Sequence, residues 1–275
     1  MTIRTVLLHA ASETLDPATS ASRYALELAR TFDAHLAALV LELNAAMPKG
    51  FADNHAAEAG GRRRNSNVQI AADALREAAS DHGVTTSVIT DRSHVHSTPE
   101  IAADYARLAD LVVAGTCDEG LLSERIVAEA LVFQSGRPII IVPDDHDGGF
   151  AADRILVAWD YTRIAARALS DAMPFLRRAS EVTLVCFGDD KDFSTSLSQE
   201  DVLVALRHRG VEARFEQLER RSRDIGLAIC DAATERQADL LVMGASGQSR
   251  ARSFVLGGAT RGIMADPKFP TLISH

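Results

Sequence analysis

Glycines in residues 238–260 follow a pattern that suits phosphate binding. The apolar run 240–243 is typical of a buried strand; it ends at Gly244, and Gly257 and Gly258 stand directly before a helical pattern. Backbone N–H groups at a helix start have no partner within the helix, and the helix dipole favours an anion there. Glycine also permits positive φ and close approach to a ligand. The sequence therefore predicts a phosphate-binding loop, although such turns also occur without a ligand.

Side chains inside this loop offer further phosphate donors. Ser246 and Ser249 carry hydroxyl groups, and Ser249 is favoured because it follows the second glycine, Gly247. Arg250 and Arg252 present guanidinium groups, which bind phosphate as bidentate forks. Phosphate contact and a solvated loop are equally consistent with these two arginines.

The sequence around this loop occurs twice. Residues 238–244, ADLLVMG, repeat residues 109–115, ADLVVAG, and residues 155–159 repeat the pattern of residues 6–10. Residues 270–275 correspond in the same way to residues 138–143. We interpret this pattern as two copies of one domain, residues 1–143 and 153–275. The polar segment 144–152, with its paired glycines, is the predicted linker.

Each copy alternates strand and helix patterns. Strands rich in Val, Ile and Leu that alternate with helices form parallel sheets covered on both faces. The predicted fold class is α/β, with two tandem doubly wound parallel five-stranded sheets. The expected strands are 5–10, 35–42, 84–90, 111–115, 138–142, 154–159, 181–187, 211–218, 239–243 and 271–274. Two of the expected helices begin near Pro17 and Pro99, and the others span about 68–82, 123–135, 162–179, 198–209, 222–237 and 258–266. A long polar loop is expected from Asn44 to Asn67.

In sheets of this kind, ligands bind beyond the carboxyl ends of the strands, where the strand order reverses. Two features meet at that edge in the second copy. One is the loop after Gly244, and the other is Asp160, which directly follows the first strand. We therefore expect Asp160 and the glycine loop to line one site.

With these residues in place, the second copy resembles a universal stress protein domain, and the whole chain resembles the tandem form of that family, with its adenine-nucleotide alpha-hydrolase-like fold. The ATP-binding members carry Gly, two residues, Gly, nine residues, Gly and then Ser or Thr. Gly244, Gly247 and Gly257 match that spacing. The resemblance implies a stress-response module that binds ATP, ADP or AMP, with or without Mg²⁺, in the second copy only.

The resemblance also assigns roles to residues at the strand ends. Asp160 fills the position of an aspartate that bonds adenine, and Phe187 fills the position whose backbone contacts adenine. Met243, at the end of the glycine strand, completes this set.

One position departs from the family pattern. Gly258 stands where the family has Ser or Thr. A hydroxyl bond to a charged phosphate stabilises by about 1.5–3 kcal/mol, so its loss weakens binding roughly ten- to hundredfold. Thr260 matches a threonine that family members direct at phosphate. The alternative interpretation is a scaffold or interaction protein that kept the fold and lost the ligand.

The first copy lacks these features. Ala11 stands at the counterpart of Asp160, and Asp118 and Glu119 follow its glycine strand. Carboxylates repel phosphates at neutral pH. The first copy is therefore expected to bind no ATP and to serve as a structural or pairing domain.

The composition excludes several classes of function. The 275 residues carry a net charge of −9, which argues against nucleic acid or an anionic membrane as the main partner. No apolar run approaches the roughly 18 residues of a membrane span, and we expect a cytoplasmic protein. No Walker lysine, Gly-x-Ser-x-Gly or His-Glu-x-x-His motif is present. We expect no enzyme, with slow ATP hydrolysis at most.

Other side chains are weaker candidates. His94 and His96 share a strand face, with Asp91 nearby, and are a possible metal pair, but two exposed histidines are the commoner arrangement. Cys117 is expected to be inert because neighbouring carboxylates raise a thiol pKa. Cys186 is expected in the core.

The family resemblance also concerns partners. Domains of this family pair through the last strand, so we expect the two copies to pair with each other. Chain dimerisation would then give a four-domain homodimer, and the protein partner is not specified by the sequence.

Overall fold

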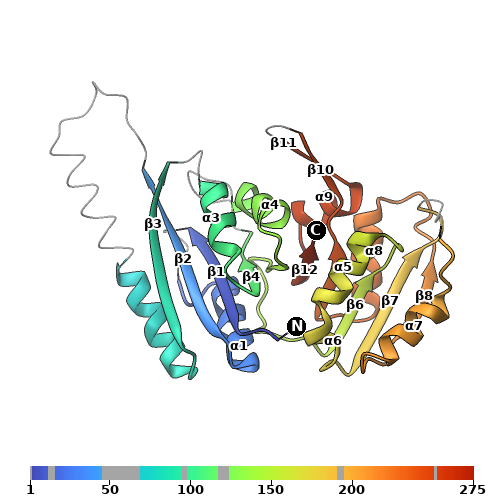
Figure 1. The fold of residues 1–275 in the computed structure, drawn as a ribbon, viewed down its shortest axis with the longest axis horizontal. Helices are drawn as coiled ribbons and strands as arrows, with labels where there is room; N and C mark the ends of the chain where they lie inside the picture. Colours follow the sequence, from blue (N-terminus) through green and yellow to red (C-terminus); the bar gives the residue numbers. More distant parts are fainter. Residues whose placement is uncertain are drawn as a thin grey trace.

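The protein, analysed as a computed structural model, contains two halves that lie side by side (Figure 1). The structure describes residues 2–11, 16–44, 69–94, 98–116, 124–190, 195–250 and 253–275. For residues 10, 11, 42–44, 92–94, 124, 247–250 and 253–256, only the backbone is described. The predicted loop between Asn44 and Asn67 lies almost entirely outside this range.

The described part of the chain forms one main sheet of ten strands, in the order β3-β2-β1-β4-β5-β12-β9-β6-β7-β8. The strands are β1 (Thr5–Ala11), β2 (His35–Asn44), β3 (Thr86–His94), β4 (Leu111–Ala114), β5 (Ile139–Ile141), β6 (Arg154–Ala158), β7 (Glu181–Phe187), β8 (Arg214–Leu218), β9 (Leu240–Gly244) and β12 (Thr271–Ser274). Their buried positions are dominated by Val, Ile and Leu, as strands covered on both faces require. The predicted α/β class and five parallel strands per half are confirmed.

The two five-stranded halves are joined into a single sheet. Within each half the neighbouring strands are parallel, whereas β5 and β12 pair antiparallel, with Ile140 opposite Leu272. The expected pairing of the two copies through their last strands is confirmed. Two separate sheets were predicted, whereas the structure contains one continuous sheet.

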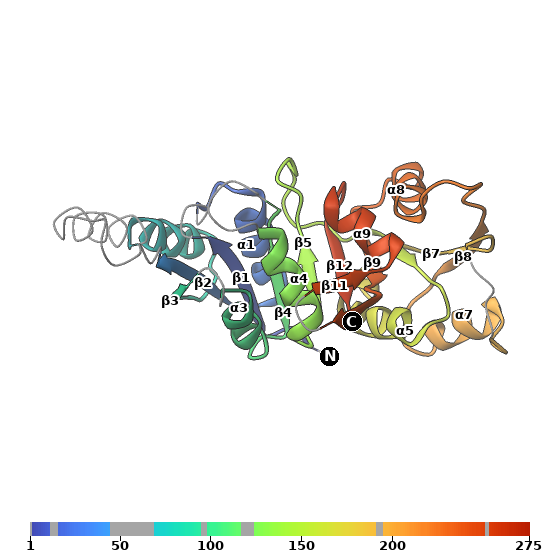
Figure 2. The same ribbon diagram turned by 90° about the horizontal axis from the view of Figure 1, so that it is seen from above.

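Helices cover both faces of this sheet (Figure 2). One face packs against α1 (Ser20–Phe32), a helix over residues 69–81, α5 (Arg163–Asp171), α6 (Met173–Leu176) and α7 (Gln199–Arg207). The other face packs against α3 (Thr98–Ala106), α4 (Glu124–Gln134), α8 (Ile225–Glu235) and α9 (Gly258–Ala265). Each of the two apolar layers contains residues of both halves.

Two helix boundaries differ from the prediction for local reasons. The first helix begins at Ser20 rather than near Pro17, because Thr19 is the N-cap and its hydroxyl accepts from Ser22 N. The predicted helix 162–179 is divided into α5 and α6. Pro174 lies in the first turn of α6, where its missing N–H is tolerated, whereas inside a longer helix it would break a hydrogen bond.

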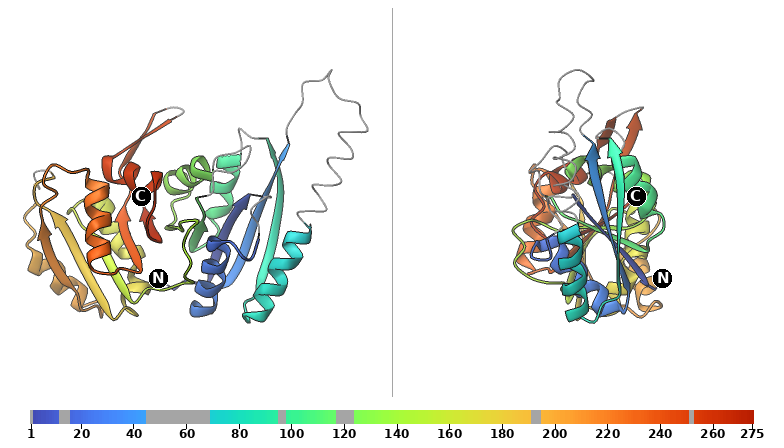
Figure 3. Two further views of the ribbon diagram at one scale, coloured as in Figure 1. Left: turned by 180° about the vertical axis from the view of Figure 1, so that it is seen from behind. Right: turned by 90° about the vertical axis from the view of Figure 1, so that its left-hand side faces the viewer.

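The segment between the halves packs against α1. Phe150 N–H donates to Glu27 Oε2 at 3.0 Å, and the Phe150 ring contacts Tyr24, Phe32 and Phe175 with centroids 5.4–6.0 Å apart. A β-carbon on Gly149 would clash with the Glu27 carboxylate, so a larger residue there would require the Glu27 side chain to move away from Phe150 N–H. The segment thus joins α1 of the first half to α6 of the second. Figure 3 shows the two halves from further sides.

The repeated Ala-Asp-Leu sequence has a structural cause. Asp110 Oδ2 accepts from the N–H groups of Arg4 and Thr5 at 2.9 and 3.0 Å. Asp239 Oδ2 accepts from Asp153 and Arg154 in the same way, at 2.8 and 2.9 Å. In each half an aspartate before the fourth strand therefore holds the start of the first strand.

Candidate functional site

The carboxyl ends of β6, β7 and β9 bring the predicted site residues of the second half to one edge of the sheet. The strand order reverses at β6, which lies between β9 and β7. Val157 pairs with Val242, and Ala158 pairs with Val185. Phe187 and Gly244 are the last residues of β7 and β9, and Asp160 follows the end of β6, the strand between them. This arrangement matches the expected ligand edge of a doubly wound sheet.

Asp160 forms the turn that starts α5. Its Oδ1 accepts from Thr162 N–H at 3.1 Å and from the Thr162 hydroxyl at 2.6 Å. Thr162 is in turn the N-cap of α5, and its Oγ1 accepts from Ala165 N at 3.2 Å. Asp160 is half-buried, so its carboxylate is oriented by the protein while part of the residue stays accessible. The Asp-x-Thr pattern is the sequence signal that would have found Thr162.

The aromatic residues around Asp160 were not predicted as site residues. Trp159 is buried, and its Nε1 has no hydrogen-bond partner among the described residues. Its ring contacts Tyr161 edge to face at 5.8 Å, and Tyr161 has φ of 59°, which is uncommon for a residue with a side chain. Asp160 therefore lies in the sequence between two aromatic residues whose rings contact each other.

Phe187 and Met243 are buried in one apolar cluster, with side-chain exposure of 7% and 3%. The Phe187 carbonyl accepts from Asp190 N at 3.2 Å. This bond belongs to the turn after β7. The backbone of Phe187 therefore lies at the predicted edge, while its side chain contributes to the core.

Gly244 is required by packing rather than by its backbone angle. A β-carbon there would lie 2.7 Å from Ile164 Cγ2 and 2.9 Å from Ala165 N, at the start of α5. Positive φ was expected for the glycines of the loop, but Gly244, Gly257 and Gly258 do not have it. The expectation was wrong for these three. At Gly244 and Gly257 the constraint is close contact instead, because a β-carbon would clash with Ile164 or Ser246.

The predicted loop after Gly244 contains a β-hairpin. Strands β10 (Gly247–Arg250) and β11 (Ser253–Leu256) pair antiparallel and project beyond the main sheet (Figure 1). Gly257 N–H donates to Ser246 O at 2.9 Å and closes the base of the hairpin. Gly247 and Ser249 both lie in β10. The side chains of Ser249 and Arg250, and the whole of Arg252, lie outside the described residues.

Thr260 holds the base of this hairpin. Its side chain is fully buried, and its Oγ1 accepts from Ser246 N–H at 3.1 Å. Gly257 is the N-cap of α9, where no side chain caps the helix and no acidic residue occupies the first turn. A β-carbon on Gly258 would meet Ile225 Cγ2 at an ordinary 3.5 Å. The start of α9 is therefore suited to an anion.

The corresponding edge of the first half is organised differently. The strand β1 ends at Ala11, and Thr116 N–H, after β4, donates to Asp144 Oδ1 at 3.2 Å. One backbone N–H group of this loop is therefore already bonded to the carboxylate of Asp144. Cys117, Asp118 and Glu119 lie outside the described residues.

His9 on β1 was also missed by the sequence analysis. It is 4% exposed, and its Nδ1 has no hydrogen-bond partner among the described residues. Burial lowers the pKa of His9 to about 4. The imidazole is therefore neutral at neutral pH.

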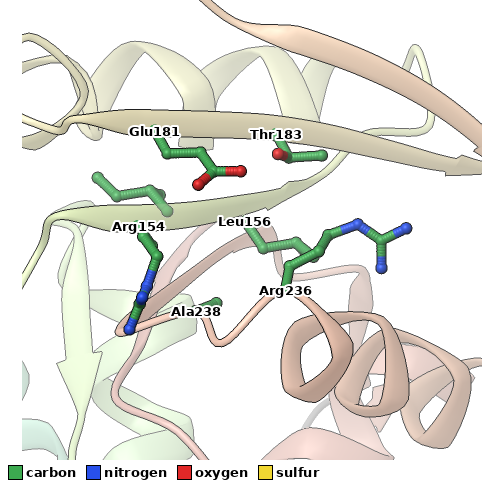
Figure 4. A pocket seen from close by; sticks show the side chains of 7 residues that line it. Arg154, Leu156, Glu181, Thr183, Arg236 and Ala238 are labelled. Atoms are coloured by element: carbon green, nitrogen blue, oxygen red, sulfur yellow. The ribbon is translucent and has the colours of Figure 1, made fainter.

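A small cavity lies at the opposite, amino-terminal end of β6 and β7 (Figure 4). It is lined by Arg154, Ile155, Leu156, Glu181, Thr183, Arg236 and Ala238. Its volume of about 10 Å³ accommodates roughly one water molecule. It is therefore unrelated to the edge that carries Asp160.

The remaining candidates give a mixed outcome. Cys186 is buried, as expected. The side chain of His94 and all of His96 lie outside the described residues. Within the described part, no group of three or more His, Cys, Asp or Glu residues is arranged to hold a metal. No helix in that part combines the length and apolar character needed to cross a membrane.

Comparison with known proteins agrees with this architecture. Residues 151–275 match the family model described as the Universal stress protein family. The structure is similar to that of a universal stress protein from Archaeoglobus fulgidus, with 18% sequence identity, coverage of 98% of this chain and 97% of that one, and a TM-score of 0.71. A functionally unknown protein from Pseudomonas aeruginosa is 14% identical, with coverage of 99% and 92% and a TM-score of 0.62. At these identities the likeness shows the fold. No curated protein matches the chain in sequence.

Proposed function

Because residues 151–275 belong to the universal stress protein family and the whole chain has the tandem fold of such a protein, we propose that the second half is an adenine-nucleotide-binding module of a stress response. Asp160 and the backbone of Phe187 bind adenine beside Met243. The glycine loop from Gly244 to Gly258 and the start of α9 bind the phosphates of ATP, ADP or AMP. Bound nucleotide then biases association with a protein partner.

The observation that carries this proposal is the meeting of Asp160 and the glycine loop at one edge. They follow β6 and β9, which are adjacent parallel strands at the point where strand order reverses. The start of α9, beside the same loop, lacks a side-chain cap, so backbone N–H groups there suit phosphate oxygens. We propose Ser249 in β10 and Thr260 in α9 as the hydroxyl donors to phosphate.

Two features of the first half support our proposal that only the second half binds a nucleotide. Ala11 offers no carboxylate where Asp160 lies, and the loop after β4 is bonded to Asp144. A nucleotide phosphate would have to displace that carboxylate and would be repelled by it. We therefore propose one nucleotide site per chain.

The test is isothermal titration calorimetry with ATP and ADP on the wild type and on Asp160→Asn. Asparagine keeps an oxygen acceptor for Thr162, so the turn before α5 is preserved, but it replaces the second carboxylate oxygen with an NH₂ donor. We expect at least about tenfold weaker binding, because a bond to a charged group contributes about 1.5–3 kcal/mol.

The matched control is Asp147→Ala, which removes an exposed carboxylate between the halves. It should bind like the wild type. Equal heats for the wild type and Asp160→Asn would remove Asp160 from the site.

A second function, a scaffold without ligand, is favoured by two observations at the phosphate end. Gly258 has no hydroxyl, and Thr260, the alternative donor, is fully buried and bonded to the loop. Gel filtration of the purified protein distinguishes the two functions. Nucleotide that co-elutes, seen as excess absorbance near 260 nm, contradicts the scaffold.

A further inference from the structure

We propose that the first half positions the glycine loop of the second half through the corner between α4 and β5. Phe133, near the end of α4, and Gly136, before β5, are the two contact points. The consequence for nucleotide affinity rests on the proposed function, whereas the effect on the loop does not.

The first connection runs through the end of β12. Ala245, in the loop after Gly244, donates its N–H to Ser274 O at 2.7 Å, and its carbonyl accepts from His275 Nδ1 at 2.9 Å. The His275 ring contacts the Phe133 ring edge to face, with centroids 5.0 Å apart and an interplanar angle of 68°. Such aromatic pairs are worth about two- to tenfold in an equilibrium constant.

The second connection runs through α5. The backbone of Gly244 packs directly against Ile164 and Ala165 at the start of that helix. Arg167, one turn further along, donates from its guanidinium to Gly136 O at 3.3 Å. Loop and corner are thus joined on two sides, by α5 and by β12.

The loop transmits this support to the start of α9. Ser246, next to Ala245, donates its N–H to Thr260 Oγ1 and accepts from Gly257 N. A displacement of Ala245 therefore moves the N-terminal turn of α9. Phe133 acts through His275 and touches no ligand in this scheme, so it is a positioning residue. The half without a nucleotide signature thereby gains a defined role.

The first experiment needs no ligand. Amide hydrogen exchange is measured at Ala245, Ser246 and Gly257 in the full chain and in Phe133→Ala. Exchange should be about fivefold faster in the variant, as expected for the loss of one aromatic contact. Phe133→Tyr keeps the ring and should restore slow exchange.

Phe32→Ala is the matched control. Phe32 also contacts the other half, through Phe150 and Phe175, but it is not bonded to the loop. It should lower the melting temperature and leave loop exchange at the wild-type rate. Equal acceleration in Phe32→Ala and Phe133→Ala would overturn the proposal, as would unchanged loop exchange in a folded Phe133→Ala.

The second experiment separates the two parts of the first connection. His275→Phe keeps the ring and loses the donor to Ala245, whereas His275→Asn keeps a donor and loses the ring. ATP binding is measured by calorimetry in both variants and in Phe133→Ala, each with about fivefold weaker affinity expected. Wild-type affinity in all three would overturn the coupling to the ligand. If the wild type itself binds no nucleotide, the proposed function fails and the exchange experiment alone decides the positioning role.

Discussion

Asp160 and Thr260 each have a partner within the protein besides their proposed part in the site. Asp160 orients Thr162 at the start of α5, and Thr260 anchors Ser246 at the base of the hairpin. Such bonds fix the side chains before a ligand arrives, which lowers the entropy cost of binding. Variants of either residue therefore need a control that preserves the internal bond.

Gly258 is the residue at which a gain of affinity is expected. Its φ is negative and a β-carbon would make only an ordinary contact with Ile225, so a side chain fits. Gly258→Ser supplies the hydroxyl found elsewhere in the family and should tighten ATP binding about tenfold. Gly258→Ala adds the β-carbon without the hydroxyl. Equal tightening by alanine and serine in calorimetry would mean that the hydroxyl does not reach phosphate.

His9 predicts a dependence of stability on pH. Its folded-state pKa of about 4 lies below the ordinary value of 6.5, because burial disfavours the charged ring. The unfolded chain therefore binds the proton first, and stability falls as pH decreases from 6.5 towards 4. The loss between pH 7 and pH 4 from this group is about 3 kcal/mol.

The measurement is urea unfolding of the wild type and His9→Leu at pH 7, 5.5 and 4.5. The variant removes the titrating group, so its free energy of unfolding should decline less over this range. If the free energy of unfolding declined equally in the two proteins between pH 7 and pH 4.5, His9 would not be the cause of the loss of stability in acid.

Local sequence patterns predicted most of the helices and strands that position the site. Strands β7 and β12 have the predicted bounds, and most other elements agree within a few residues, because apolar periodicity and caps are properties of neighbouring residues. The pairing of β10 with β11 was not predicted. Residues 247–256 are polar or mixed and lack a two-residue turn signal, so a loop was the simpler expectation.

At the scale of the whole molecule, the continuous sheet makes the two halves interdependent. They share the β5–β12 pairing, and each apolar layer contains residues of both. Ile140 and Leu272 meet at this pairing and are fully buried. Neither half could open alone without exposing the strand edge of the other.

We therefore expect one cooperative unfolding transition. Trp159 is the single tryptophan and reports on the second half, whereas far-UV circular dichroism reports on all helices. Their urea transitions should coincide. Ile140→Ala, in the first half, should destabilise both signals equally by about 2–5 kcal/mol. A tryptophan transition separated from the dichroism transition would show that the halves unfold independently.

The sequence by itself determined the α/β class, the duplication, the glycine spacing and the position of Asp160 after a strand. These features depend on residue type and short spacing, which act within one element or turn. The tertiary structure alone decided that the pairing of the last strands is antiparallel and makes one continuous sheet, and that Thr260 faces the loop. It also decided that Phe133 meets His275. Such contacts join residues distant in the chain, and their geometry depends on how whole elements pack.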